Sequence, residues 1–262
     1  MFADRRPGLV TPVVSAVTLV AWLLLWGWDN SSYGRYHGEA GWLRDGVAGS
    51  LCSALHDTSF AFTITFHIVA WLLMLTAMML ATTLPLLHVF RRMTRARPNG
   101  GQLMALLLAG YFIAWTLFGA VAHGADAALH GAAGRSDWLT VHAWVPGAAI
   151  LATAGVYQLS SLKRRCLDKC RSPMMFIAMH WRGSHERRSS FAIGFRHGLF
   201  CIGCCWALML LMFAVGTASI AWMLAIAVLM GAEKTLSWGK SIRVPLGVGL
   251  LSWAALITAA NL

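Results

Sequence analysis

Two short stretches of this chain hold five of its six cysteines at helical spacing. Cys166 and Cys170 lie four residues apart, and Cys201, Cys204 and Cys205 follow about thirty residues later. Residues three or four apart share one face of an α-helix, so each group presents its thiols from one side of a helix. Thiolates from two neighbouring helices supply a tetrahedral or trigonal site for a soft metal ion. The spacing therefore predicts a metal site made by the first pair and the vicinal pair Cys204–Cys205, with Cys201 assisting.

The charge around the first cysteine pair favours metal binding. The pair is surrounded by five basic side chains: Lys163, Arg164, Arg165, Lys169 and Arg171. Nearby cations lower the pKa of a thiol toward the thiolate form that binds metal. Two other interpretations remain open, because buried cysteine also serves as a small packing residue and grouped thiols also carry out thiol–disulfide exchange.

Methionines extend the sulfur pattern beyond the cysteines. Met74 and Met78 share one face of an expected helix with Trp71, and Met209 lies one turn beyond Cys205. Thioether and thiolate sulfur are the soft ligands that select Cu(I), whereas zinc is the alternative where thiolates dominate. Because methionine also fills gaps in apolar cores, these residues are either transfer positions for Cu(I) or packing residues.

Seven apolar runs of membrane-spanning length must position these side chains. The chain is 58% hydrophobic and 12% charged, whereas about 25% of the residues of a soluble domain are charged. A helix needs roughly 20 apolar residues to cross a bilayer. Such runs lie near 9–28, 61–88, 102–123, 140–161, 196–215, 218–234 and 244–261. We therefore predict an all-α, polytopic bundle of about seven transmembrane helices, forming one membrane domain over residues 1–262, with a kink near Pro85 in the long second run.

The distribution of charge predicts the orientation. Of the 21 Lys and Arg residues, 18 lie in the segments 1–8, 91–101, 162–197 and 234–243. Positive charge collects on the cytoplasmic side, which places the N-terminus in the cytoplasm, the C-terminus outside and both cysteine groups near the inner surface. In that reducing compartment structural disulfides are disfavoured. The net charge of +11 is thus explained by contact with anionic lipid and needs no nucleic-acid partner.

The sequence also allows predictions for several segments outside the cysteine groups. Residues 174–195 read as an interfacial segment, and Glu233 is expected to pair with the basic stretch 163–171. No function is predicted for the outer loop 29–60 or for its Cys52. A nitrogen ligand for the thiol site is available from four inner histidines: His88, His180, His185 and His197. No known catalytic motif is present, which favours a role other than that of an enzyme.

Six motifs together resemble a known family. They are Trp71-x-x-Met74-x-x-x-Met78-Met79, Gly110-Tyr111-x-x-x-Trp115, Gly155-x-Tyr157-Gln158, Lys163-x-x-Cys166-Leu167-x-x-Cys170-Arg171-x-Pro173, Gly203-Cys204-Cys205-Trp206-x-x-Met209 and Glu233-Lys234. This pattern is similar to that of a bacterial family of predicted metal-binding integral membrane proteins, and the resemblance implies metal binding without a defined reaction.

The combined prediction is a multi-pass protein of the bacterial inner (cytoplasmic) membrane that binds a soft metal, Cu(I) before zinc, for handling, delivery or transport. Two alternatives remain. One is a non-catalytic subunit or assembly factor of a larger membrane complex, and the other is a membrane thiol–disulfide redox enzyme.

Overall fold

The computed structural model describes residues 9–30, 60–181, 183, 185–215 and 220–261, and all regular elements within these ranges are helical. The all-α prediction is confirmed for this part of the chain. Most of the expected outer loop, including Cys52, lies outside the described residues.

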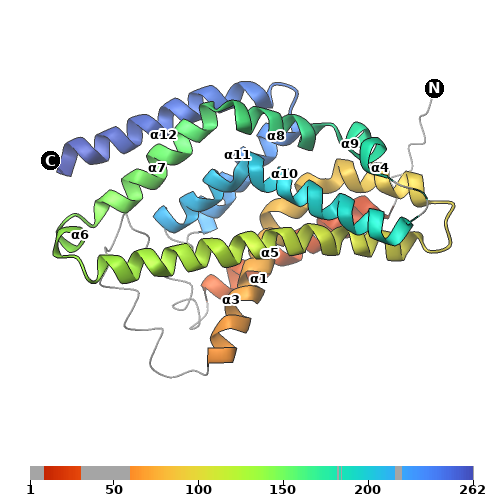
Figure 1. The fold of residues 1–262 in the computed structure, drawn as a ribbon, viewed down its shortest axis with the longest axis horizontal. Helices are drawn as coiled ribbons and strands as arrows, with labels where there is room; N and C mark the ends of the chain where they lie inside the picture. The colour runs from red at the N-terminus through yellow and green to blue at the C-terminus, as the bar shows by residue number, and fades with distance from the viewer. Residues whose placement is uncertain (1–8, 31–59, 182, 184, 216–219, 262) are drawn as a thin grey trace.

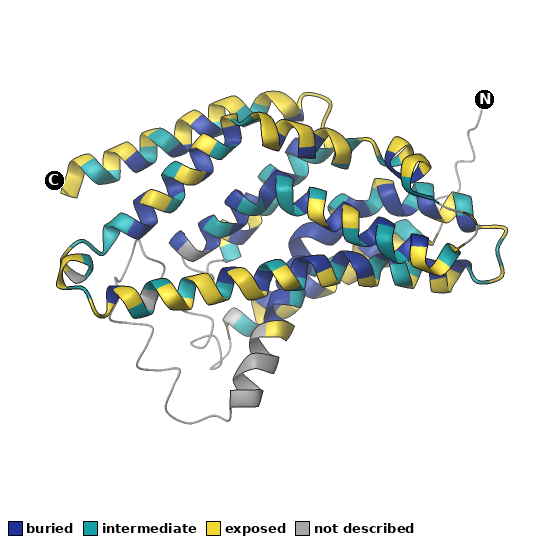
Figure 2. Ribbon diagram, in the orientation of Figure 1, coloured by how far each residue is buried: buried dark blue, intermediate teal, exposed yellow. Residues whose placement is uncertain are grey.

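The helices form a bundle along two long members, α5 and α10, which pack side by side (Figure 1). Helices α7 and α12 pack together along another edge. The α-helices are α1 (Val10–Asp29), α3 (Phe60–Leu75), α4 (Leu84–Thr94), α5 (Gly100–Ala133), α6 (Asp137–Val141), α7 (Trp144–Leu159), α8 (Ser161–Arg171), α9 (Pro173–His180), α10 (Glu186–Val215), α11 (Ile220–Thr235) and α12 (Gly239–Asn261). The facing sides of α5 and α10 are buried, whereas much of α12 is exposed (Figure 2).

Five described helices are long and apolar enough to cross a membrane, or six if α7 and α8 form one span bent by 66°. Helices α7 and α11 lie in the predicted spans 140–161 and 218–234, but each has 16 residues. The multi-helix character is therefore confirmed in part, and the total of seven spans stays a prediction.

The second apolar run leaves regular α-helix shortly before Pro85, although residues 68–94 still count as one helix of membrane-spanning length, and the kink itself stays a prediction. A π-helical turn, Thr76–Leu80, and a 3₁₀ turn, Ala81–Thr83, separate α3 from α4, and Pro85 lies in the first turn of α4. Proline is tolerated in a first turn because its missing N–H would have no partner there. The π turn buries the two consecutive residues Met78 and Met79, and π turns often mark functional sites.

The segment 174–195 differs from the single interfacial unit that was expected. Its first part forms the short helix α9, while its last part belongs to α10, which starts at Glu186 instead of near residue 196. Glu186 stabilises this early start because a carboxylate favours the N-terminus of a helix. Its side chain also accepts a hydrogen bond from Asn99 (3.2 Å) and pairs with Arg97, which ties α10 to the turn before α5.

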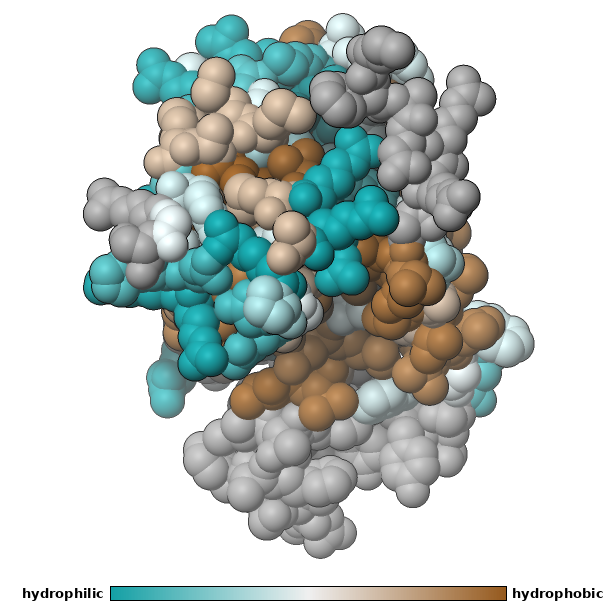
Figure 3. Space-filling view, turned by 90° about the vertical axis from the view of Figure 1, so that its right-hand side faces the viewer, coloured by the Kyte–Doolittle hydropathy of each residue, from teal (hydrophilic) through white to brown (hydrophobic). Residues whose placement is uncertain are grey.

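Basic side chains gather at the end of the bundle made by the α4–α5 turn, α9 and the start of α10. Figure 3 looks toward this end, where hydrophilic surface lies beside apolar surface. Its exposed basic residues include Arg91, Arg92, Arg95, Arg187 and Arg188. Helix α12 runs toward the opposite end of the bundle (Figure 1).

Glycines allow α10 to approach α5 closely. A Cβ atom at Gly194 would lie 1.8 Å from the Leu107 carbonyl oxygen, and one at Gly198 would lie 2.8 Å from the Ala114 Cβ. A Cβ at Gly110 on α5 would likewise meet the Phe191 carbonyl oxygen, at 2.3 Å. Small residues four apart are a common device for bringing two membrane helices into backbone contact. This contact fixes the rotation of α10 and hence the direction in which its cysteines point.

Replacing Gly194 with alanine should destabilise the fold by about 1–3 kcal/mol, the usual cost of overpacking. Helix propensity alone predicts the opposite sign, since alanine favours a helix by roughly 0.5–1 kcal/mol over glycine. Gly249→Ala is the control, because nothing lies within 4 Å of a Cβ there. Thermal unfolding in detergent measures both variants, and equal midpoints would contradict the close approach of α5 and α10.

Candidate metal centre

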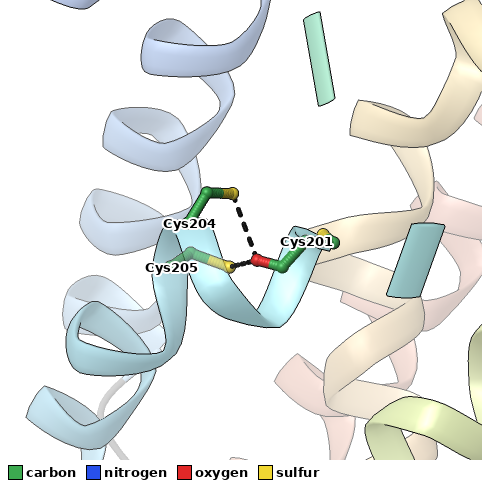
Figure 4. Close-up of side chains that lie close together, drawn as sticks. All are labelled: Cys201, Cys204 and Cys205. Atoms are coloured by element: carbon green, nitrogen blue, oxygen red, sulfur yellow. Dashed lines mark hydrogen bonds between the residues drawn. The ribbon is translucent and has the colours of Figure 1, made fainter. Parts of the chain in front are cut away.

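Helix α10 holds three thiols in one place. The Sγ atoms of Cys201, Cys204 and Cys205 all lie within 4.8 Å of one another, and all three residues are buried. The Cys204 and Cys205 thiols donate hydrogen bonds to the Cys201 carbonyl oxygen, at 3.1 and 2.9 Å (Figure 4). The predicted common face of these three residues is therefore present.

Helix α8 brings the other cysteine pair to the same place. The Cys170 thiol donates to the Cys204 Sγ atom at 3.9 Å. Cys166 packs against Gly203, where an added Cβ would lie 2.7 Å from its Sγ atom. Helix α8 begins at a Ser160 cap, whose hydroxyl accepts from the Lys163 N–H at 3.1 Å. The two cysteine groups, about thirty residues apart in sequence, thus lie side by side where α8 contacts α10, and a single ion shared by Cys166, Cys170, Cys204 and Cys205 stays a prediction.

The expected effect of the basic residues on the first cysteine pair is wrong for Cys166. Burial raises the pKa of the Cys166 thiol, and the neighbouring Cys204 raises it further. Arg164 and Arg165 are exposed on α8, and Lys163 is directed to a carboxylate instead of to the thiol. The neighbouring charges are close in sequence but do not face the sulfur.

The predicted partner of Glu233 is confirmed. Its carboxylate lies 2.7 Å from the Lys163 Nζ atom, and both side chains are almost wholly buried, at 2% and 0% exposure. Gln158 completes the group, because its Nε2 donates to the Glu233 Oε1 at 3.1 Å and its Oε1 accepts from Lys163. Arg171 donates to the Glu233 carbonyl oxygen at 2.6 Å. Both ends of α8 are therefore fixed to the end of α11.

Two further residues contact the Cys201 thiol, and a third, Met79, contacts one of these two. The Lys234 Nζ atom lies 3.0 Å from the Cys201 Sγ and 3.4 Å from the Met79 Sδ. The Tyr111 hydroxyl lies 3.4 Å from the same Sγ on another side. Sequence reasoning assigned none of these three to the site. The available signal was their place in the motifs Met78-Met79, Gly110-Tyr111 and Glu233-Lys234.

Of the four inner histidines, His197 lies nearest in position to the thiols. It is 4% exposed and one turn before Cys201 on α10. Its Nδ1 atom has no hydrogen-bond partner among the described residues. By contrast, His88 bonds the Thr11 hydroxyl at 2.8 Å, and the Nδ1 of His180 bonds the Phe176 carbonyl oxygen at 2.8 Å.

The three predicted methionines lie in the same buried core as the thiols. Met74, Met78 and Met209 all belong to the apolar cluster that contains the cysteines of α10. Among the described residues, no hydrogen bond joins their thioethers to the thiols. Their part in metal binding stays a prediction.

Residues 68–257 match a family described as PpoB2, copper chaperone. The chain belongs to the PpoB2 copper chaperone family. Neither a curated protein nor a solved structure matches the chain. The matched range contains both cysteine groups, and together they support a role in handling copper or another metal.

The centre of this PpoB2-family chain suits a soft ion by the nature of its donors. Sulfur ligands select Cu(I), zinc or an iron–sulfur cluster over hard cations. Metal–thiolate bonds of about 2.3 Å require sulfur atoms roughly 4 Å apart, near the observed spacing of 4.8 Å or less. Cys204 and Cys205 would exchange hydrogen bonds to the Cys201 carbonyl for metal bonds, so modest side-chain rotation suffices.

Glu233→Gln should reduce the free energy of unfolding by about 3–5 kcal/mol, because it leaves the Lys163 charge buried and unpaired. Asp168→Asn is the control, since it removes an ion pair with Lys240 in which both partners are more than half exposed, worth about 1 kcal/mol at most. Thermal unfolding in detergent provides the comparison. A loss no greater than that of the control would contradict the buried pair.

Mild oxidation of the metal-free protein should join Cys170 to Cys204. Their sulfur atoms lie 3.9 Å apart, and a small shift reaches the S–S length of about 2.05 Å. Peptide mapping by mass spectrometry identifies the bond, and Cys170→Ser should abolish it. Cross-links made only within α10 would contradict the contact between α8 and α10.

Proposed function

We propose that this PpoB2-family chain is an integral protein of the inner (cytoplasmic) membrane that binds Cu(I) near the cytoplasmic surface and delivers it onward. The metal is held chiefly by Cys166, Cys170, Cys204 and Cys205, with Cys201 assisting. It is a carrier of the ion, not an enzyme that transforms a substrate. The copper is cargo in this proposal.

The observation that carries the proposal is the contact of Cys170 on α8 with the three thiols of α10. Cys170 lies 3.9 Å from Cys204, and Cys204 belongs to the triad on α10 whose sulfur atoms lie within 4.8 Å of one another. Sulfur donors without a nearby carboxylate ligand favour a soft monovalent ion over the hard cations magnesium and calcium. The copper chaperone family supports the same choice.

The surface supports a membrane location. Exposed large apolar residues run along α1 and α12, among them Leu19, Leu24, Val248 and Leu256. The basic end in Figure 3 matches the cytoplasmic side expected from the charge distribution. On this orientation the cysteine centre lies near the middle of α10, which begins at the basic end with Glu186.

A stripe of possible ligands along α10 supports delivery instead of simple storage. His197, Cys201, Cys205, Met209 and Met212 follow at intervals of four, four, four and three residues, and all five are buried. With a rise of 1.5 Å per residue this stripe spans about 22 Å, compared with a hydrocarbon thickness of about 30 Å. Met74 and Met78 belong to the same core and extend the set of soft donors. We infer that copper moves outward along this face.

The 3.9 Å separation of Cys170 and Cys204 also favours a second candidate, a thiol–disulfide redox protein. Such a protein would cycle between dithiol and disulfide without bound metal. Metal content distinguishes the two candidates.

Detergent-purified protein, reduced and supplied with Cu(I), should retain one copper ion per chain through gel filtration. Cys204→Ser and Cys170→Ser should each lose it, because each removes a thiolate from the shared site. Cys52→Ser, outside the family match, is the matched control and should retain copper. Elemental analysis measures the ratio to protein.

Loading should also protect the clustered cysteines from a thiol reagent, as read by mass spectrometry. The proposal fails if metal-free and copper-treated protein react equally at all five residues. A disulfide that forms and breaks in protein without metal would support the redox candidate instead.

A further inference from the structure

The side chain of Lys234 ends among sulfur atoms. Its Nζ lies 3.0 Å from the Cys201 Sγ, 3.4 Å from the Met79 Sδ and 3.9 Å from the Cys205 Sγ. The nearest oxygen in this group, the Thr82 hydroxyl, is 3.5 Å away. A positive group from α11 therefore occupies the point on which donors from α10, the π turn and the 3₁₀ turn converge.

These donors are poorly matched to an ammonium ion. Lysine carries a compact, strongly hydrated charge that prefers oxygen acceptors, whereas thioether sulfur is a weak acceptor. The same sulfur atoms are good ligands for Cu(I). The π turn contributes to this arrangement, because it buries Met79 beside Met78 and directs one of these thioethers to the lysine.

The Lys234 side chain can leave without moving its helix. The preceding residue, Glu233, is held through its carboxylate by Lys163 and through its carbonyl by Arg171. Lys234 itself is only half-buried, and Thr235 and Leu236 beside it are exposed. A flexible four-carbon stem allows the ammonium group to swing to the surface while its methylene groups remain packed.

We propose that Lys234 is a resident cation that occupies the sulfur cluster of the metal-free protein, and that Cu(I) binds by displacing its ammonium group. Met79 then joins the cysteines as a ligand. The ammonium charge leaves as the Cu(I) charge arrives, and each thiol that becomes a copper ligand releases its proton to water. When copper leaves, Lys234 returns, and this return favours release to an acceptor. The inference rests on the proposed Cu(I) site.

Lysine labelling followed by mass spectrometry tests the displacement directly in the full chain. A small acylating reagent should modify Lys234 slowly in metal-free protein and several-fold faster after Cu(I) is added. Lys240, with 59% of its side chain exposed, is the accessible reference, and the fully buried Lys163 is the protected one. Neither reference should change with copper.

The rate of copper release tests the competition. Lys234→Leu should slow transfer of Cu(I) to a soluble chelator by about tenfold, the order expected when a unit charge that competes for the same sulfur atoms is removed. Lys234→Arg keeps a competing cation and should release copper near the wild-type rate, which separates charge from misfolding. Lys240→Leu is the surface control. X-ray absorption should find one sulfur neighbour fewer around copper in Met79→Leu.

The outcomes separate this inference from the proposed function. If wild-type protein binds no copper, the proposed site and the inference both fail. If copper binds through the cysteines but Lys234 labelling does not change, the inference alone fails. Faster copper loss from Lys234→Leu also overturns it, because Lys234 would then be a permanent counter-charge of the loaded site.

Discussion

The ion pair between Lys163 and Glu233 is the interaction on which the centre depends. Two opposite charges removed from water are stable only together, and loss of either leaves an uncompensated charge in a low dielectric. Here the pair joins the first turn of α8 to the last turns of α11, and Gln158 of α7 satisfies both partners. The Cys166–Cys170 pair and Lys234 are therefore held in a fixed relation before any metal arrives.

Helix α10 has two adjacent faces with different functions: one packs against α5, and the other carries cysteines toward α11. Its glycines, Gly194 and Gly198, allow backbone contact with α5 and set its depth and rotation. The neighbouring face carries Cys201 and Cys205 toward α11. Gly203 also allows a close contact, because only a residue without a side chain leaves room there for the Cys166 sulfur. The glycine contacts that pack α10 therefore also determine where its cysteine ligands lie.

Sequence reasoning succeeded where local rules decide the outcome. Helical spacing was enough to place the three thiols of α10 on one face. The partner of Glu233 followed from the cost of a lone carboxylate inside a membrane. Each of these inferences uses residues near in sequence or a strong energetic penalty.

The remaining features depend on tertiary contacts or irregular turns that periodicity does not contain. Lys234 reaches Cys201 from another helix, and Met79 becomes its neighbour only because the helix adopts a π turn. The start of α10 at Glu186 depends on Arg97 and Asn99, about ninety residues earlier. The raised pKa of Cys166 likewise depends on which way the neighbouring charges face, which sequence distance does not specify.

The π turn at Thr76–Leu80 also changes how the side chains of α4 are rotated about the helix axis relative to those of α3. On one side Trp71 donates its indole N–H to the Trp115 carbonyl oxygen at 3.0 Å, and on the other Phe90 packs edge-on against Trp181. Compared with an uninterrupted α-helix of the same length, the wider π turn and the tighter 3₁₀ turn after it change the rotation of the chain in opposite directions. The irregular turns therefore connect two helices that pack on different partners: α3 contacts α5, and α4 contacts α9.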